Sequence, residues 1–329
     1  MPGGPIFIGG LDHSGKTLLR LMLSSHPNIA LSRRTDLWPD FYNRFGDLAR
    51  SENFERCLAA LLRHKHLRPL RPDAGRLRRE FWQGKPTYAR LFALLHEHFA
   101  QSLGRGRWGD QTAFIECFAD PIFAAYPDAR MIHMIRDPRE RFRLSLRFTA
   151  HRLGKVGPST AMWLHSVAWA RRNQLCYPDR YQVVRYESLV AHPRETLSMI
   201  CPFLGEEFLP SMLTLENAVR FGEDTSETAQ TPDTVGSDAV SKQVAAAPVP
   251  SAREIAFMEA RSGWAMISHN YQLRRTRCSP WDRFLLLVLE IPAGSLRTLA
   301  WRLSSFLQPD AAPRLRAPCG YAHKAVAAN

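Results

Sequence analysis

The fold is decided by the stretch Pro5-Ile-Phe-Ile-Gly-Gly-Leu-Asp-His-Ser-Gly-Lys-Thr17, which continues into Leu18-Leu-Arg-Leu-Met-Leu-Ser24. The first part is a short apolar run that ends in two glycines, as is typical of a buried parallel strand. The second part carries apolar residues at helical spacing, and His26-Pro27 marks the end of that helix. The sequence therefore predicts a strand, a glycine-rich turn and a helix in direct succession.

The turn matches the phosphate-binding pattern G-x-x-x-x-G-K-[ST] at every defined position. Glycines let successive backbone N–H groups point inward, and these groups bind a phosphate together with the positive end of the helix dipole. Lys16 would reach the far side of the anion, and Thr17 would offer a hydroxyl group. We expect the loop to bind a phosphate-bearing nucleotide through Gly10, His13, Ser14, Gly15, Lys16 and Thr17.

Two more strand-to-helix units follow along the chain. Residues 131–135 form an apolar run that leads into Arg136-Asp-Pro138, and proline suits a first helical turn. Residues 181–186 read as a third strand, with a helix near 195–200. Alternating strands and helices predict an α/β protein, a P-loop-type three-layer fold with a central parallel sheet flanked by helices.

Composition agrees with a globular protein and leaves the partner open. The chain has 329 residues, of which 45% are hydrophobic and 23% charged, which excludes a disordered, collagen-like or coiled-coil chain. Its formal net charge of +13 comes from 44 cationic residues, of which only six are lysines. Such an excess fits nucleic acid, an acidic membrane or an anionic ligand. Because no nucleic-acid motif is present, we do not expect a nucleic-acid partner.

The six cysteines are widely spaced and form no C-x-x-C pair, so the sequence predicts neither a zinc ribbon nor a redox motif. We expect them to be reduced, and the protein to be cytoplasmic. The N-terminus lacks the pattern of a signal peptide. No uninterrupted apolar stretch is long enough to span a bilayer, although contact with a membrane surface stays open.

Three segments stand apart in composition. Residues 222–250 are rich in small and polar residues and read as a long loop or lid. Residues 276–329 form a basic, partly apolar extension of the main domain at 1–275. The apolar run 280–291, with arginines around it, fits either an in-plane membrane helix or a helix facing the core or a partner. The arginine-rich stretch 63–79 fits a solvated helix face or an electropositive wall for an anionic acceptor.

Several motifs in one order resemble those of PAPS-dependent sulfotransferases, which use 3′-phosphoadenylyl sulfate as donor. The phosphate loop followed by Ser25-His-Pro-Asn-Ile29 is similar to the opening of that family. The other matching segments are Trp108-Gly-Asp-Gln-Thr112, Ile135-Arg-Asp-Pro-Arg139, Arg185-Tyr-Glu-Ser-Leu189, Phe203-Leu-Gly205 and Val240-Ser-Lys242. The resemblance covers about residues 5–275.

The sequence departs from the family pattern at four places. The cation inside the family's loop is His13 here, and Lys16 stands where the family has threonine. Gln111 replaces the lysine of the W-G-D-K-T segment. The family places a serine where Leu144 stands here, and Ser145 comes one residue later, about 100° around a helix.

The resemblance implies transfer of a sulfuryl group from PAPS to a hydroxyl or amine of an acceptor, without a metal ion. Arg136 would bind the 3′-phosphate, with Ser145 and Lys242 as further cofactor ligands, while Lys16 would offset charge on the bridging oxygen. Two phosphate sites at two strand-to-helix junctions suit a 3′,5′-bisphosphorylated nucleotide. Asp36 is our first candidate for the general base, Asp110 the second, and His13 a proton carrier or phosphate ligand.

The acceptor and the alternatives stay open at this point. We expect an anionic carbohydrate, a protein (through tyrosine) or a small molecule as acceptor, and the sequence gives no oligomeric state. The complete G-x-x-x-x-G-K-T also fits a P-loop kinase or NTPase using ATP–Mg²⁺, with Asp137 as the metal ligand. A nucleotide-binding interaction protein without catalytic activity is the third alternative.

Overall fold

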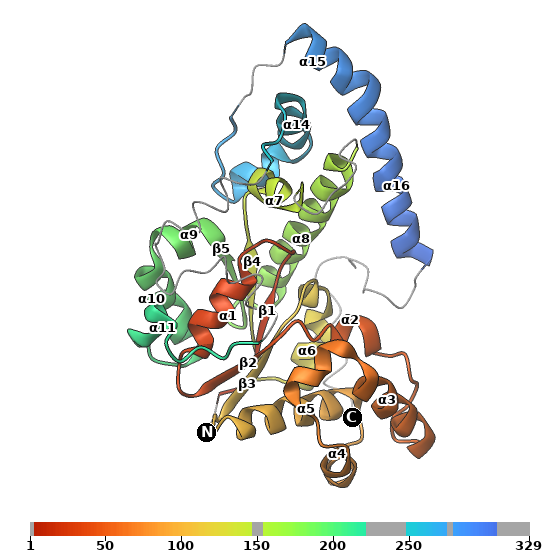
Figure 1. Cartoon of the computed structure of the whole chain (residues 1–329), viewed down its shortest axis with the longest axis vertical. Helices are drawn as coiled ribbons and strands as arrows, with labels where there is room; N and C mark the ends of the chain where they lie inside the picture. The colour runs from red at the N-terminus through yellow and green to blue at the C-terminus, as the bar shows by residue number, and fades with distance from the viewer. Residues whose placement is uncertain (1–2, 147–153, 222–247, 275–278, 308–329) are drawn as a thin grey trace.

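The computed structural model describes residues 3–146, 154–221, 248–274 and 279–307. Its centre is a sheet of five parallel strands in the order β2-β3-β1-β4-β5. The strands are β1 (Ile6–Gly9), β2 (Ile29–Arg33), β3 (Arg107–Gln111), β4 (Arg130–Ile135) and β5 (Tyr181–Arg185). Helices cover both faces, so the predicted three-layer α/β fold is confirmed (Figure 1).

The two faces of the sheet follow from alternation along each strand. Ile6 and Ile8 pack on one side, together with α1 (Lys16–Ser24) and α10 (Pro193–Leu204). Phe7 points to the other side. There it packs among residues of α5 (Tyr88–Ser102). Because all three residues are fully buried, β1 is the central strand that both layers share.

The remaining helices of the two layers divide between the same two faces. On the first face lie α9 (Tyr186–Ala191) and α11 (Ser211–Thr214). On the second lie α2 (Leu37–Phe41), α3 (Ser51–Arg63), the 3₁₀ helix η1 (Lys65–Leu70), α4 (Ala74–Phe81), the 3₁₀ helix η2 (Ile115–Phe118) and α6 (Ala119–Ala125).

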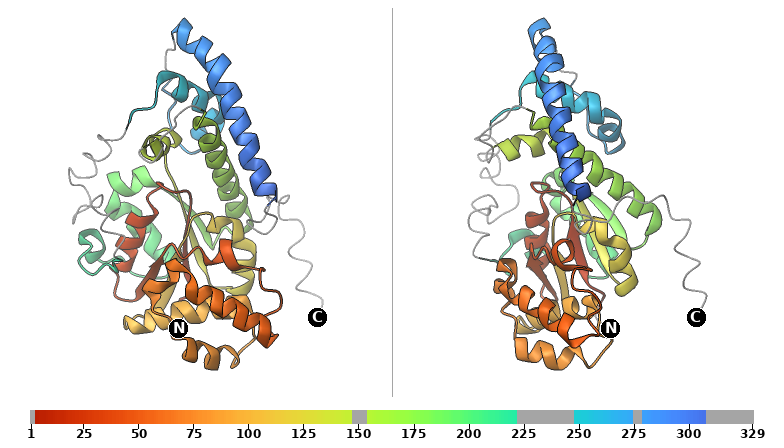
Figure 2. Two further views of the ribbon diagram at one scale, coloured as in Figure 1. Left: turned by 45° about the vertical axis from the view of Figure 1, so that its right-hand side comes forward. Right: turned by 90° about the vertical axis from the view of Figure 1, so that its right-hand side faces the viewer.

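A third group of helices lies beyond the carboxyl ends of β1 and β4. It comprises α7 (Pro138–Ser145), α8 (Val156–Cys176) and α14 (Ala252–Ser268). Helix α8 begins in this group, and its later turns pass along the sheet (Figures 1 and 2). The carboxyl edge of the sheet therefore lies between the layers and this group, where open α/β sheets bind ligands.

The last described segment is a helical rod made of α15 (Pro280–Leu285), the π-helical turn η4 (Leu286–Glu290) and α16 (Ile291–Leu307). The rod lies against α8 and α14, where Gly294 meets Gly157 backbone to backbone. In the described part of the chain, no helix is long and apolar enough to cross a bilayer. The predicted lid lies mostly outside the described residues.

The cysteines differ in one respect from the expectation of six reduced thiols. Cys57, Cys117 and Cys201 are free and buried, whereas Cys176 is disulfide-bonded. A disulfide depends on two cysteines meeting in space, which wide spacing along the chain neither predicts nor excludes. The expectation is therefore wrong for Cys176.

Candidate functional site

The phosphate loop joins β1 to α1 and depends on residues with positive φ. These are Gly10 (φ 110°), His13 (φ 65°) and Gly15 (φ 92°). A Cβ on Gly10 would clash with the carbonyl of Met134, and one on Gly15 would clash with the ring of Tyr186. The two glycines thus let the loop lie directly against β4 and α9.

A buried carboxylate that belongs to none of the sequence motifs anchors the start of the loop. The backbone N–H of Gly10 donates to Oε2 of Glu116 at 2.9 Å, and Ser166 Oγ donates to Oε1 at 3.1 Å. Glu116 lies in η2 and is fully buried. A second anchor is Ser14, whose hydroxyl donates to the carbonyl of Leu11 at 2.7 Å.

Lys16, the first residue of α1, folds back over the loop. Its Nζ donates to the carbonyls of Gly10 (2.7 Å) and Leu11 (2.8 Å) and lies 3.7 Å from Asp12 Oδ1. Burial lowers the pKa of this amine, an effect that the charge of Asp12 opposes. The ammonium group therefore lies over the loop and donates to two of its carbonyl groups. A bound phosphate would compete with these carbonyl groups for the ammonium group. Thr17 follows it in the first turn of α1.

His13, at the tip of the loop, stands where the resembled family has a cation. Burial lowers its pKa to about 4, and the nearby positive charges of Arg141, Lys16 and Arg136 also lower it. The imidazole is consequently neutral near pH 7. It can accept or donate a hydrogen bond there, but it supplies no positive charge.

Arg136 directly follows β4 and lies beside the loop. Its guanidinium stacks 3.9 Å above the centre of the Tyr186 ring, and Nη1 donates to the carbonyl of His13 at 3.3 Å. Its Nε is buried and has no hydrogen-bond partner in the described part of the chain. The backbone is fixed by Trp163, whose Nε1 donates to the Arg136 carbonyl at 2.9 Å. The structure thus places Arg136, the predicted ligand of the second phosphate, next to the loop predicted to bind the first.

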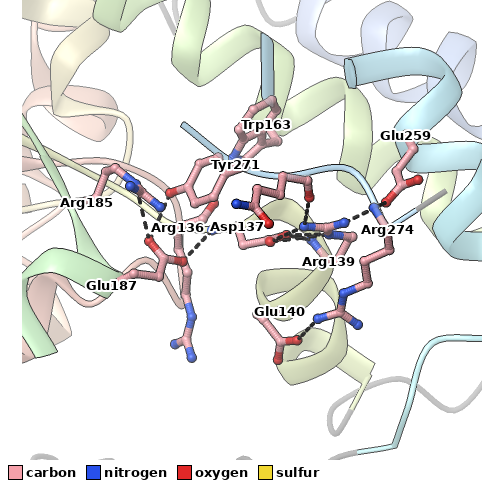
Figure 3. Close-up of polar contacts among 11 residues, drawn as sticks. Arg136, Asp137, Arg139, Glu140, Trp163, Arg185, Glu187, Glu259, Tyr271 and Arg274 are labelled. Carbon is pink, nitrogen blue, oxygen red and sulfur yellow. Dashed lines mark hydrogen bonds and ion pairs between the residues drawn. The ribbon is translucent and has the colours of Figure 1, made fainter. Parts of the chain in front are cut away.

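The residues after Arg136 belong to an ion-pair network (Figure 3). Asp137 caps α7 and binds Arg139, whose Nη2 lies 2.6 Å from Asp137 Oδ2. Arg139 also pairs with Glu259 at 2.6 Å. Glu187 accepts from the backbone N–H of Asp137 (2.9 Å) and from Tyr271 Oη (3.0 Å). Asp137, the carboxylate considered above as a Mg²⁺ ligand, is thus paired with Arg139. Arg139 in turn joins α7 to α14 through Glu259.

The first candidate base lies just beyond β2. Asp36 adopts φ 53°, and its Oδ2 lies 3.2 Å from Arg34 Nε and 3.8 Å from His66 Nε2. Burial raises the pKa of this carboxyl, and the charge of Arg34 opposes the shift. A carboxylate with a raised pKa is a stronger proton acceptor, as a general base requires.

Asp110, the second candidate, is enclosed by hydroxyl groups. It accepts from Ser32 Oγ (2.7 Å), Thr35 Oγ1 (2.9 Å) and Thr112 Oγ1 (3.0 Å), and it is fully buried. Burial works against its ionisation, but the hydrogen bonds and His96 lower its pKa overall. Its geometry is that of a group that joins β2 to β3, so Asp36 stays the better candidate.

Comparison with known proteins adds to this geometry. A match to the sulfotransferase family spans residues 5–210. The chain belongs to this family. It is 24% identical over 272 residues to a protein-tyrosine sulfotransferase of Drosophila melanogaster, covering 76% of this chain and 49% of the fly protein. The chain therefore spans about half the length of that curated relative.

Two solved sulfotransferase domains share the fold. The domain from the Synechococcus PCC 7002 olefin synthase superposes with a TM-score of 0.55 at 23% identity, covering 82% of this chain and 95% of that one. The domain from the curacin biosynthetic pathway gives 0.53 at 18% identity, covering 83% and 99%. At these identities the likeness concerns the fold alone.

Arg141 is a cation that we did not predict. It lies on α7, is 5% exposed, and its Nε has no hydrogen-bond partner among the described residues. Its positive charge lowers the pKa values of Asp12, His13 and Lys16. Burial lowers its own pKa to about 10. Arg141 lies five residues after Arg136 and belongs to none of the motifs found in the sequence.

The other predicted cofactor ligands contribute less to this geometry. Ser145 is the last residue of α7, and its Oγ donates to the carbonyl of Phe142 in the same helix at 2.7 Å. It remains a prediction as a phosphate ligand. Lys242 lies outside the described residues.

A cavity of about 790 Å³ opens on the second face of the sheet, between α2, α5 and α6. Its walls include Trp38, Tyr42, Phe45 and Tyr88. None of the loop residues, Arg136 or Asp36 lines it, so it does not belong to the place where the phosphate ligands meet.

Proposed function

We propose that this protein transfers a sulfuryl group from PAPS to a hydroxyl or amine group of an acceptor. The observation that carries the proposal is the meeting of two cationic junctions, the loop with Lys16 and the end of β4 with Arg136, where Nη1 of Arg136 lies 3.3 Å from the carbonyl of His13. Two adjacent anion sites suit a nucleotide with phosphate on both its 3′ and 5′ positions. The buried Nε atoms of Arg136 and Arg141, for which the described residues provide no hydrogen-bond partner, suit an anionic ligand as well.

In this proposal each cation has a separate position along the donor. The loop N–H groups and Lys16 bind the 5′-phosphate, and Arg136 binds the 3′-phosphate. Arg141 supplies the positive charge at the loop tip that the neutral His13 does not. PAPS brings the sulfuryl group and a phosphate leaving group, so the protein mainly positions the reactants and stabilises the developing charge.

Asp36 is the proposed general base. It would take the proton of the attacking hydroxyl or amine, and His66 and Arg34 would hold the carboxylate in place. His66 belongs to η1, within the arginine-rich stretch 63–79. An acceptor at Asp36 would therefore lie next to a basic surface, which favours an anionic carbohydrate or a protein segment with acidic residues around a tyrosine.

The engagement of Asp137 with Arg139 argues against the kinase alternative, since that alternative relied on Asp137 as its Mg²⁺ ligand. The inactive binding protein is less well supported, because the partly buried Asp36 is a carboxylate that could serve as a base.

The test is transfer of radiolabelled sulfate from PAPS to a panel of acceptors: heparan and chondroitin chains, acidic tyrosine peptides and small phenols. We expect labelled product with at least one acceptor class. If PAP binds the protein tightly and no class is labelled, the inactive alternative gains over our proposal.

A further inference from the structure

The helical rod formed by α15, η4 and α16 carries a surface that the proposed reaction does not use. Its inner side is firmly held. Glu290 is buried, accepts from the backbone N–H of Gly154 at 3.2 Å and pairs with Arg253 at 3.3 Å. Leu286 and Ile291 pack on a cluster that contains Phe142 and Phe257 of α7 and α14.

The outer side of the rod is apolar and exposed. Trp281, Leu287 and Leu296 expose 64%, 64% and 68% of their surface. Large hydrophobic residues with at least two fifths of their surface exposed continue this side: Phe284, Val288, Leu289 and Leu299. Trp281, Phe284 and Val288 recur at spacings of three and four, so they form one stripe along the helix. The rings of Trp281 and Phe284 stack at 5.4 Å.

The accessible charges on this segment are mainly positive. Of the two acidic groups of residues 279–299, Glu290 is buried, while Asp282 is half-exposed and accepts from Ser279 in a capping box. Arg283 is exposed and Arg297 is half-exposed beside the stripe. The described part of this surface therefore presents large apolar side chains together with arginines.

We propose that this outer side of the rod, from Trp281 to Leu299, docks on an anionic lipid surface. A row of large apolar residues with arginines beside it is the pattern of a helix that lies in the membrane interface. Lys and Arg near such a surface are attracted by anionic headgroups. A second copy of the chain fits less well, because the arginines of two copies would meet and each copy carries a net charge of +13.

The geometry agrees with a flat partner. The rod from 280 to 307 is about 40 Å long, and Figures 1 and 2 show it along one side of the upper part of the molecule. A straight helix with one apolar side can lie on a bilayer over its whole length. The phosphate loop lies on the sheet edge, away from the rod, so docking leaves the proposed donor site open.

The experiment uses the full chain and sedimentation with vesicles of two compositions, phosphatidylcholine alone and phosphatidylcholine with an equal part of phosphatidylglycerol. The test variant combines Trp281→Gln, Leu287→Gln and Leu296→Gln. The control combines Leu175→Gln and Met199→Gln, two residues with 71% and 61% exposure on α8 and α10. All five side chains are exposed, and a thermal melt shows whether the fold survives.

We expect the wild type and the control to bind the anionic vesicles more tightly at low salt than at high salt, and to bind pure phosphatidylcholine weakly. The test variant should lose roughly tenfold or more in affinity. Equal binding by test variant and control contradicts the proposal, and so does absence of wild-type binding. Light scattering supplies a further outcome: a dimer that the test variant abolishes assigns the surface to a second copy instead.

Discussion

Arg136 and Arg141 lie five residues apart in the sequence, yet they are proposed to contact opposite ends of the donor. Comparing PAP with adenosine 5′-monophosphate, which lacks the 3′-phosphate, separates the two contacts. Loss of a charged hydrogen bond costs about 1.5–3 kcal/mol. Arg136→Gln should therefore weaken PAP by roughly 10- to 150-fold and leave the monophosphate unchanged.

Arg141→Gln should weaken both nucleotides by similar factors, because the contact assigned to it is at the 5′ end. Titration calorimetry gives both affinities for each variant. Arg143→Gln is the matched control, since Arg143 lies on the same helix and pairs with Glu140 at 3.7 Å. If Arg141→Gln weakens only PAP, its assigned position is wrong. If it weakens neither, Arg141 is not a donor ligand.

Asp36→Asn should abolish most of the turnover and leave PAP binding intact. The raised pKa of Asp36 sets the sign of the pH dependence: wild-type turnover should fall as the pH drops through that raised value, because the protonated carboxyl cannot act as a base. The same shift affects stability in the opposite direction. A protonated Asp36 contributes stability at low pH, which is lost as the pH rises through its folded-state pKa.

The variant with asparagine should consequently be at least as stable as wild type at neutral pH. Turnover with an acceptor, measured from acid to neutral pH, together with a denaturant titration, checks both statements. Near-normal turnover removes Asp36 as the base, whereas a destabilised variant contradicts the raised pKa of its carboxyl.

At the scale of elements, the crossing of α16 over α8 depends on Gly157 and Gly294. A Cβ on Gly157 would clash with the backbone of Gly294. Gly157→Ala should therefore lower the free energy of unfolding by about 1–3 kcal/mol, even though alanine favours a helix. Gly263→Ala in α14 is the control, because its Cβ would meet only Leu273 at 3.5 Å. Urea unfolding of both variants measures the difference, and equal stability contradicts a close crossing.

The sequence predicted the elements that carry a pattern of their own. The strand, loop and helix of 5–24 showed as an apolar run, glycines at fixed spacing and a helical period, and Arg136 followed a strand with Pro138 after it. Glu116 and Arg141 have no such local pattern. Their roles come from α7 and η2 being brought against the loop, which only the tertiary fold determines. The spacing of the cysteines likewise did not indicate the disulfide of Cys176.

Over the whole molecule, the cationic residues behind the net charge of +13 lie on separate surfaces. Lys16 and Arg136 contact the loop, and part of the 63–79 stretch lies near Asp36 through His66. In that stretch Arg76 and Arg78 are already paired, with Glu80 (2.6 Å) and Glu55 (2.8 Å). In the rod, Arg283 is exposed and Arg297 is half-exposed. The basic residues of the chain therefore lie at the proposed donor site and on two further surfaces.

The most direct test of a 3′,5′-bisphosphate site is a thermal shift with PAP, compared with ATP–Mg²⁺ at the same concentration. A ligand at 100 times its Kd stabilises the folded state by about 2.7 kcal/mol, which raises the Tm by several degrees. We predict this rise with PAP and little change with ATP–Mg²⁺. A rise with ATP–Mg²⁺ and none with PAP would contradict the assignment of the two phosphate sites and favour a kinase or NTPase.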